Sequence, residues 1–276
     1  MEPLLRVEGL SLAFGGVKAL DGVSFNARAG AITAMIGPNG AGKTTAINCI
    51  SGAYRPQAGR VFFAGREVTG LAAHRLARLG LTRTFQNLQV FSQLSVLENV
   101  MVGLHAVTHQ GFASAILRLP AMRREERAIA EQAMAALEDL GLAAVAHRPA
   151  GQLSYGDRKR LELARALAAR PQMVLLDEPV AGLNAAETDA MGQALVRARD
   201  LGVGLVLVEH DMALVMKISD QVVVLSFGQK IAQGDPLQVQ NDPQVLATYL
   251  GGRQEPVNGF AAGAGRGPAA GEAAHA

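Results

Sequence analysis

The chain carries the segment Gly37-Pro38-Asn39-Gly40-Ala41-Gly42-Lys43-Thr44-Thr45, directly after an apolar run at residues 31–36. A strand, this pattern and then a helix form the context of a phosphate-binding loop, whose N–H groups and helix end face the phosphates. A glycine-rich loop that merely turns is the alternative, and Lys43-Thr44 at the required place disfavours it. The sequence therefore predicts a nucleoside triphosphate site, with Lys43 on the β- and γ-phosphates and the Thr44 hydroxyl on Mg²⁺. Its predicted binding residues are Gly37, Asn39, Gly40, Gly42, Lys43, Thr44 and Thr45.

Composition excludes several other classes of protein. The 276 residues are 49% hydrophobic and 18% charged, enough for a large α/β core with an inserted subdomain. A net charge of +2 gives no reason to expect a nucleic-acid surface. No run approaches the ~18–20 apolar residues of a membrane span, and the first residues show no export signal. We expect a cytoplasmic protein in which Cys49, the single cysteine, lies buried in the helix after the loop.

The order of apolar segments predicts an α/β fold. Continuous apolar runs at residues 32–36, 173–176, 205–208 and 222–225, with helical intervals, indicate βαβ units and a parallel sheet. Alternating residues at 4–9 and 23–27, and a hairpin near 61–67, indicate an antiparallel β subdomain.

Between residues 95 and 169 the apolar spacing becomes helical. One predicted amphipathic helix covers residues 125–140, with Ile129, Ala133, Met134, Leu137 and Leu140 facing inward. The predicted division is a nucleotide-binding core at 1–86 and 161–252, a helical insertion at 87–160, and a disordered Gly/Ala-rich tail at 253–276.

Acidic and histidine side chains follow two of the predicted parallel strands. Asp177 and Glu178 come after residues 173–176, where a carboxylate holds Mg²⁺ in phosphate-loop enzymes and a second can activate water. His210 follows residues 205–208, so we expect it at the same sheet edge, donating to a γ-phosphate oxygen. Taken alone, each of these features has a plain structural explanation; together with the phosphate loop they agree on one chemistry.

A second anion site is predicted where Ser154 and Gly156 precede a helix. A hydroxyl and free N–H groups there face a positive helix end. Ordinary helix capping explains Ser154 equally well on these grounds alone.

Together these motifs resemble those of ABC-type ATPases, over residues 4–251. The resemblance implies that Ser154 and Gly156, in the signature loop (residues 153–157), meet the γ-phosphate bound by an opposing subunit, in a head-to-tail dimer with two ATPs. It implies that Gln86 contacts Mg²⁺ or water, that residues 181–184 form a loop crossing the dimer interface (the crossing loop), and that Phe14 stacks on adenine.

Within that family, residues 82–87, 181–184, 209–212 and 233–236 are similar to the ATPases of branched-chain amino-acid importers, and residues 104–124 to their longer-insertion type. This likeness implies a second, non-identical ATPase, two membrane-spanning permeases and, indirectly, a periplasmic binding protein, with this chain peripheral on the cytoplasmic face of the inner membrane. No nucleic-acid partner is expected. Two alternatives remain: another cargo, such as amides, urea or exported lipopolysaccharide, and a soluble ABC-type ATPase acting on DNA or ribosomes.

One residue departs from the family pattern. The signature loop usually continues with glutamine, and here the residue is Asp157. A carboxylate there favours the helix dipole but brings negative charge near a triphosphate, unless Arg158, Lys159 and Arg160 compensate. We therefore expect nucleotide-driven dimerisation to be weakened at this half-site.

Overall fold

The computed structural model describes residues 2–84, 90–105 and 120–250, and contains two sheets. The six-stranded sheet has the order β10-β9-β3-β8-β7-β6 and is parallel except at its β10 edge. Its strands are β3 (Ile32–Ile36), β6 (Leu81–Arg83), β7 (Met173–Asp177), β8 (Gly204–Val208), β9 (Gln221–Ser226) and β10 (Gln229–Gly234). The predicted parallel sheet is confirmed.

The second sheet is antiparallel, with the order β2-β1-β4-β5. It is built from β1 (Leu5–Phe14), β2 (Val17–Ala27), β4 (Ala58–Phe63) and β5 (Arg66–Glu67). The predicted antiparallel subdomain is present, and its first two strands are longer than expected because only Gly15 and Gly16 separate them.

Alternating side chains of the six-stranded sheet divide the core into two layers. On β7, for example, Val174 and Leu176 pack in the layer of helices α5 (Tyr155–Ala168), α6 (Ala185–Asp200) and α7 (Met212–Ile218). Met173 and Leu175 pack in the layer of α1 (Lys43–Ile50) and the antiparallel sheet. Both faces are covered, so every residue of β3, β7 and β8 is buried and nearly all of them are apolar.

The helices follow from the apolar spacing of the sequence. Ile129, Ala133, Leu137 and Leu140 are buried and Met134 is partly buried against them, as predicted. The helices are α1 (Lys43–Ile50), α2 (Ala73–Arg78), α3 (Val96–His105), α4 (Pro120–Asp139), α5 (Tyr155–Ala168), α6 (Ala185–Asp200), α7 (Met212–Ile218), α8 (Pro236–Gln240) and α9 (Pro243–Leu250), with 3-10 turns at Ala143–Val145 and Ala150–Gln152.

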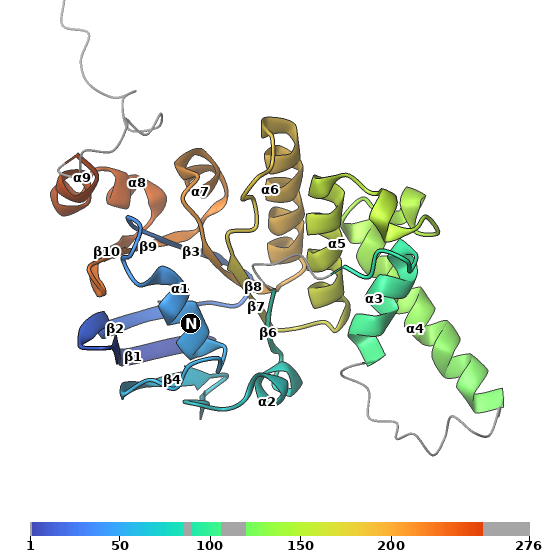
Figure 1. Ribbon diagram of the computed structural model, residues 1–276, viewed down its shortest axis with the longest axis horizontal. Coiled ribbons are helices and arrows are strands. Elements are labelled where there is room, and N and C mark those ends of the chain that lie inside the picture. Colours follow the sequence, from blue (N-terminus) through green and yellow to red (C-terminus); the bar gives the residue numbers. More distant parts are fainter. Residues whose placement is uncertain (1, 85–89, 106–119, 251–276) are drawn as a thin grey trace, which may run out of the picture.

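The helices α3, α4 and α5 pack together beside the sheet (Figure 1). The division at 87–160 stays a prediction; its end falls within α5. The proposed tail at 253–276 lies outside the described residues, as does most of the 104–124 segment. In the part of the chain described, no helix is long and apolar enough to cross a bilayer.

Cys49 lies on α1 with 2% of its surface exposed, as predicted for a buried apolar residue. Burial raises the pKa of its thiol to about 11. The thiolate is therefore scarce at neutral pH.

Candidate nucleotide site

The phosphate loop joins β3 to α1 through backbone that only glycine fits. Gly37 and Gly42 have φ of 150° and 98°, and a Cβ on either would lie 2.1 Å from the Leu225 carbonyl oxygen or 2.4 Å from that of Ala19. Helix α1 starts without a side-chain cap or an acid in its first turn, so its N-terminal N–H groups stay available for an anion.

Lys43 is folded into this loop. Its Nζ donates to the carbonyl oxygens of Gly37 and Pro38, at 2.7 and 3.0 Å, and the residue is 9% exposed. Burial lowers the pKa of the Lys43 ammonium, opposed by the charges of Glu178 and Asp177. The ammonium is thus held inside the loop, beside the predicted path of the phosphates.

Strand register brings the predicted site residues to one sheet edge. Met35 of β3 and Asp177 of β7 both pair with Val208 of β8, so these three strands end at the same level. The phosphate loop follows β3, Glu178 follows β7 and His210 follows β8. Ligands of open α/β sheets bind at such carboxyl ends.

Asp177 lies at the centre of a polar network. Thr44 Oγ1 donates to its Oδ1 at 3.4 Å, and Arg83 Nη2 donates to its Oδ2 at 3.1 Å. Arg83 also donates to Asn48 and Ser51 of the α1 region, at 2.5 and 3.0 Å. Burial raises the pKa of the Asp177 carboxyl, and Arg83 opposes this. A hydroxyl and a carboxylate side by side are the oxygen ligands that Mg²⁺ prefers, so these residues fit that ion.

Glu178 and His210 lie next to each other and open to solvent. Their Oε1 and Nδ1 atoms are 4.0 Å apart, with the side chains 31% and 64% exposed. Glu178 has φ of 51°, a conformation that costs a residue of this kind about 1–3 kcal/mol and clusters at functional sites. Both side chains can therefore reach a ligand above the sheet edge.

Beneath them, the buried Glu209 carboxylate binds backbone. Its Oε1 accepts from Val180 N–H at 2.9 Å and its Oε2 from His210 N–H at 3.1 Å. Burial raises the pKa of Glu209 more than these donors lower it. Glu209 thus fixes His210 relative to the start of the segment that leads into the crossing loop.

The signature loop lies at the N-terminus of α5. Ser154 Oγ accepts from the Asp157 N–H at 3.0 Å. Ser154 is therefore a helix N-cap, the alternative to an anion site that its sequence position allowed. Its hydroxyl hydrogen stays available to donate elsewhere. Asp157 pairs with Arg160, one of the three cations proposed to compensate its charge. Arg158 and Lys159 instead lie near the Tyr155 ring.

The other residues predicted for the site come from other parts of the fold or lie outside the described residues. Phe14 ends β1, 48% exposed, with its ring edge-on to Tyr54 at 5.5 Å between centroids. Within one chain, α5 and its signature loop lie apart from α1 (Figure 1). Gln86 lies outside the described residues.

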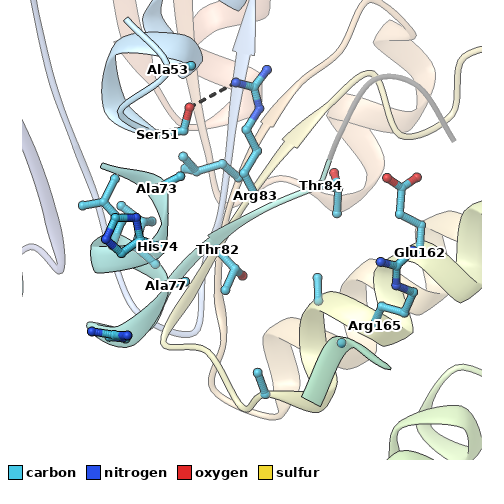
Figure 2. Close-up of a pocket in the computed structure, with 17 residues that line it drawn as sticks. Ser51, Ala53, Ala73, His74, Ala77, Thr82, Arg83, Thr84, Glu162 and Arg165 are labelled. Carbon is cyan, nitrogen blue, oxygen red and sulfur yellow. Dashed lines mark hydrogen bonds between the residues drawn. The ribbon is translucent and has the colours of Figure 1, made fainter. Parts of the chain in front are cut away.

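A cavity of about 420 Å³ lies between α2 and β6 on one side and α3 and α5 on the other. Figure 2 shows His74 and Ala77 of α2 facing Glu162 and Arg165 of α5, with Arg83 turned toward Ser51. Strand β6, in its wall, leads directly to the segment that holds Gln86.

Known proteins match nearly the whole described fold. The sequence profile described as ABC transporter matches residues 20–181. The chain belongs to the ABC transporter family. A second profile, branched-chain amino acid ATP-binding cassette transporter, matches residues 229–255, and the resemblance drawn from the motifs is thereby confirmed.

Individual ABC proteins agree with this assignment. The chain is 43% identical over 250 residues to BraF of Pseudomonas aeruginosa, a high-affinity branched-chain amino acid transport ATP-binding protein, covering 90% of this chain and 98% of that one. LivG of Escherichia coli, with the same description, is 40% identical over 251 residues, 91% and 98% of the two chains. An ABC transporter cassette solved in its ADP conformation superposes with a TM-score of 0.79 at 33% identity, covering 91% of this chain and all of that one. The chain is an ABC-type ATPase.

Sequence reasoning gave no role to Arg83, Glu187 and Glu209. Both Arg83 and Glu209 stand within the family motifs quoted above, Arg83 three residues before Gln86 and Glu209 directly before His210. The sequence did hold a signal for these two residues: each is a charged residue at the end of a strand. A buried charge needs a partner, so each could have been predicted to make a polar contact.

Proposed function

We propose that this chain hydrolyses MgATP to drive import of branched-chain amino acids, as a peripheral subunit on the cytoplasmic face of the membrane. The observation that carries the chemistry is the convergence of Lys43, Thr44 and Asp177 with Glu178 and His210 at one sheet edge. The cargo is inferred from relatives whose names specify these amino acids and that match over 98% of their length.

In the proposed site, the phosphate loop residues bind the triphosphate and Phe14 stacks on adenine. Thr44 and Asp177 would hold Mg²⁺, which would supply positive charge to offset the negative charge of the phosphates. Glu178 orients and deprotonates the attacking water, while His210 donates to a γ-phosphate oxygen. These residues contribute mainly by positioning and charge neutralisation.

Ser154 and Gly156 complete the site of an opposing ATPase subunit. The separation of α5 from α1 within the chain supports this, because the signature loop reaches no phosphate of its own subunit in this arrangement. Two permease subunits complete the complex. We place their contact over the cavity between α2 and α5, because its walls come from both the sheet side (α2 and β6) and the helices α3 and α5.

Hydrolysis is tested with Glu178→Gln. Because a general base contributes typically 10²–10⁴-fold, this variant binds ATP but releases phosphate roughly that much more slowly. Near-normal phosphate release by the variant would show that Glu178 is not the base.

Cargo is tested in the source organism. Deleting the gene should abolish uptake of radiolabelled leucine, isoleucine and valine, with restoration by the wild-type gene and not by Glu178→Gln. Loss of urea or amide uptake instead would assign the other cargo.

Docking is tested with Ala77→Trp in the cavity wall. The isolated variant should keep its ATPase activity while uptake is lost, since only the permease contact is blocked. Normal uptake would place the permeases elsewhere.

A further inference from the structure

One carboxylate joins the two loops that face the proposed partner. Glu187, in the first turn of α6, accepts the Gly156 N–H of the signature loop at its Oε1, at 3.2 Å. Its Oε2 accepts the Asn184 N–H of the crossing loop, also at 3.2 Å. Asn184 in turn accepts the Glu187 N–H at 3.0 Å, which completes a capping box.

The packing at Gly156 is tight. A Cβ added to this glycine would lie 2.8 Å from the carboxyl carbon and the Oε1 of Glu187. Beside it, the Tyr155 ring lies 3.4 Å from where a Cβ on Gly182 would stand. The signature loop and the crossing loop therefore lie side by side, and Glu187 of α6 bridges them although 31 residues separate it from Gly156.

The charge of Glu187 is not neutralised as that of Asp157 is. In the ranges the structure describes, its carboxylate bonds only to backbone N–H groups, whereas Asp157 pairs with Arg160. An anion held by N–H groups at a helix N-terminus occupies the kind of position that a phosphate takes.

We propose that Glu187 is a positioning residue that holds the signature loop to the crossing loop before nucleotide binds, and that it must leave the Gly156 N–H when an opposing γ-phosphate arrives. This rests on the proposed function of Ser154 and Gly156. A single N–H cannot donate fully to both anions, and two anions at one helix end repel each other. ATP-driven closure therefore begins by displacing an internal carboxylate.

The test uses the transporter complex purified through a tag on this chain, with Mg²⁺ and the non-hydrolysable analogue AMP-PNP. Hydrogen exchange of the segment holding Gly156 is measured without nucleotide and across an analogue titration. Glu187→Gln should raise exchange without nucleotide, because its amide supplies one acceptor oxygen where the carboxylate supplies two. It should lower the analogue concentration for half-protection by roughly three- to tenfold, because the competing charge is gone.

Asp189→Asn is the matched control, since it removes one charge from the same helix at a residue that pairs with Lys217 instead. It should leave both readouts unchanged. Glu187→Ala removes the cap as well, so Glu187→Gln, in which the capping box survives, carries the test if the alanine variant unfolds.

The outcomes separate the two proposals. In the first case, the analogue protects the Gly156 segment in the wild type, but Glu187→Gln needs the same or a higher analogue concentration for half-protection. That result would overturn the inference and leave the proposed function standing. If Glu187→Gln lowers the melting temperature and leaves the nucleotide response unchanged, the inference is also overturned, because Glu187 is then only a structural helix cap. No analogue-dependent protection in the wild type would overturn both.

Discussion

Two helix N-termini in this chain are expected to bind the same kind of phosphate, and they are built differently. Helix α1 begins after glycines with no acid in its first turn and with Lys43 folded into the loop. Helix α5 has Ser154 as its N-cap and carries Asp157 in its first turn, and its Gly156 N–H donates to Glu187. The first is prepared for an anion at all times, whereas the second already holds one of its own.

This contrast matches the roles proposed for the two ends. The α1 end binds the phosphates of the chain's own nucleotide, so an anion-binding end without acids suits it. A site that must bind and release a partner in every cycle gains from affinity that is deliberately limited. The difference in acids therefore corresponds to a difference in whose nucleotide each end contacts: the chain's own at α1, and the opposing subunit's at α5.

The largest effect is expected from a substitution at the N-terminus of α1. Lys43→Ala removes the cation that the loop holds for the phosphates. Because removal of one preorganised electrostatic group typically costs 10²–10³ in turnover, we expect ATP hydrolysis to fall by that order. Phosphate release by the purified chain measures it. A loss below threefold would show that the α1 end binds the anion without this side chain.

Arg83→Met tests the support beneath the same site. With Arg83 gone, the Asp177 carboxylate loses its ion pair and its fixed orientation. Outer partners of metal ligands typically change affinity 10–100-fold, so the Mg²⁺ concentration for half-maximal activity should rise by about that factor. Arg199→Met, a change of the same type in an arginine that pairs at α6, is the control. An unchanged Mg²⁺ dependence would remove Arg83 from the site.

The buried carboxyl of Glu209 makes the stability of the core depend on pH. Its pKa is raised by burial above the ordinary 4.5, so the native state binds more protons than the unfolded state in the range just above that value. The unfolding free energy of the wild type should therefore fall, relative to Glu209→Gln, as the pH rises from 4.5 toward neutrality. Denaturant unfolding of both proteins at several pH values measures this. A difference that stays constant, or changes in the opposite direction, would contradict the raised pKa.

The smallest expected effect concerns Asp157. Its charge is paired with Arg160, and first-turn charges are worth about 0.3–1 kcal/mol, so Asp157→Gln should tighten ATP-dependent dimerisation by only about two- to fivefold. Sedimentation of the Glu178→Gln chain with and without this second change, over a range of MgATP, provides the measurement. An unchanged dimer affinity would show that Arg160 fully cancels the charge.

Part of this molecule could be predicted from sequence because its signals are local. The phosphate loop, the apolar strands and the helix at 125–140 each depend on neighbouring residues and on the period of the apolar pattern. The structure confirms the strands and the helix, and places the loop between β3 and α1 as expected. Because parallel strands end at one edge, the expected proximity of Glu178 to His210 followed as well.

The contacts that support the site could not be predicted in the same way. Arg83 meets Asp177 across 94 residues, and Glu187 meets Gly156 across 31. These pairs depend on strand order and on how α5 packs against α6, which no local pattern contains. Phe14 shows the same limit, because its exposed position at the end of β1 depends on how far β1 and β2 pair, which its neighbouring residues do not specify.

The buried Cys49 has a practical consequence for experiments on this chain. With one cysteine in the sequence, and its thiol shielded and weakly acidic, maleimide reagents at neutral pH should leave the unmodified protein essentially unlabelled. A cysteine introduced at an exposed position such as Ala186 would then be the only reactive thiol. Spin labels or fluorophores for following subunit approach can be attached there without first replacing the native residue.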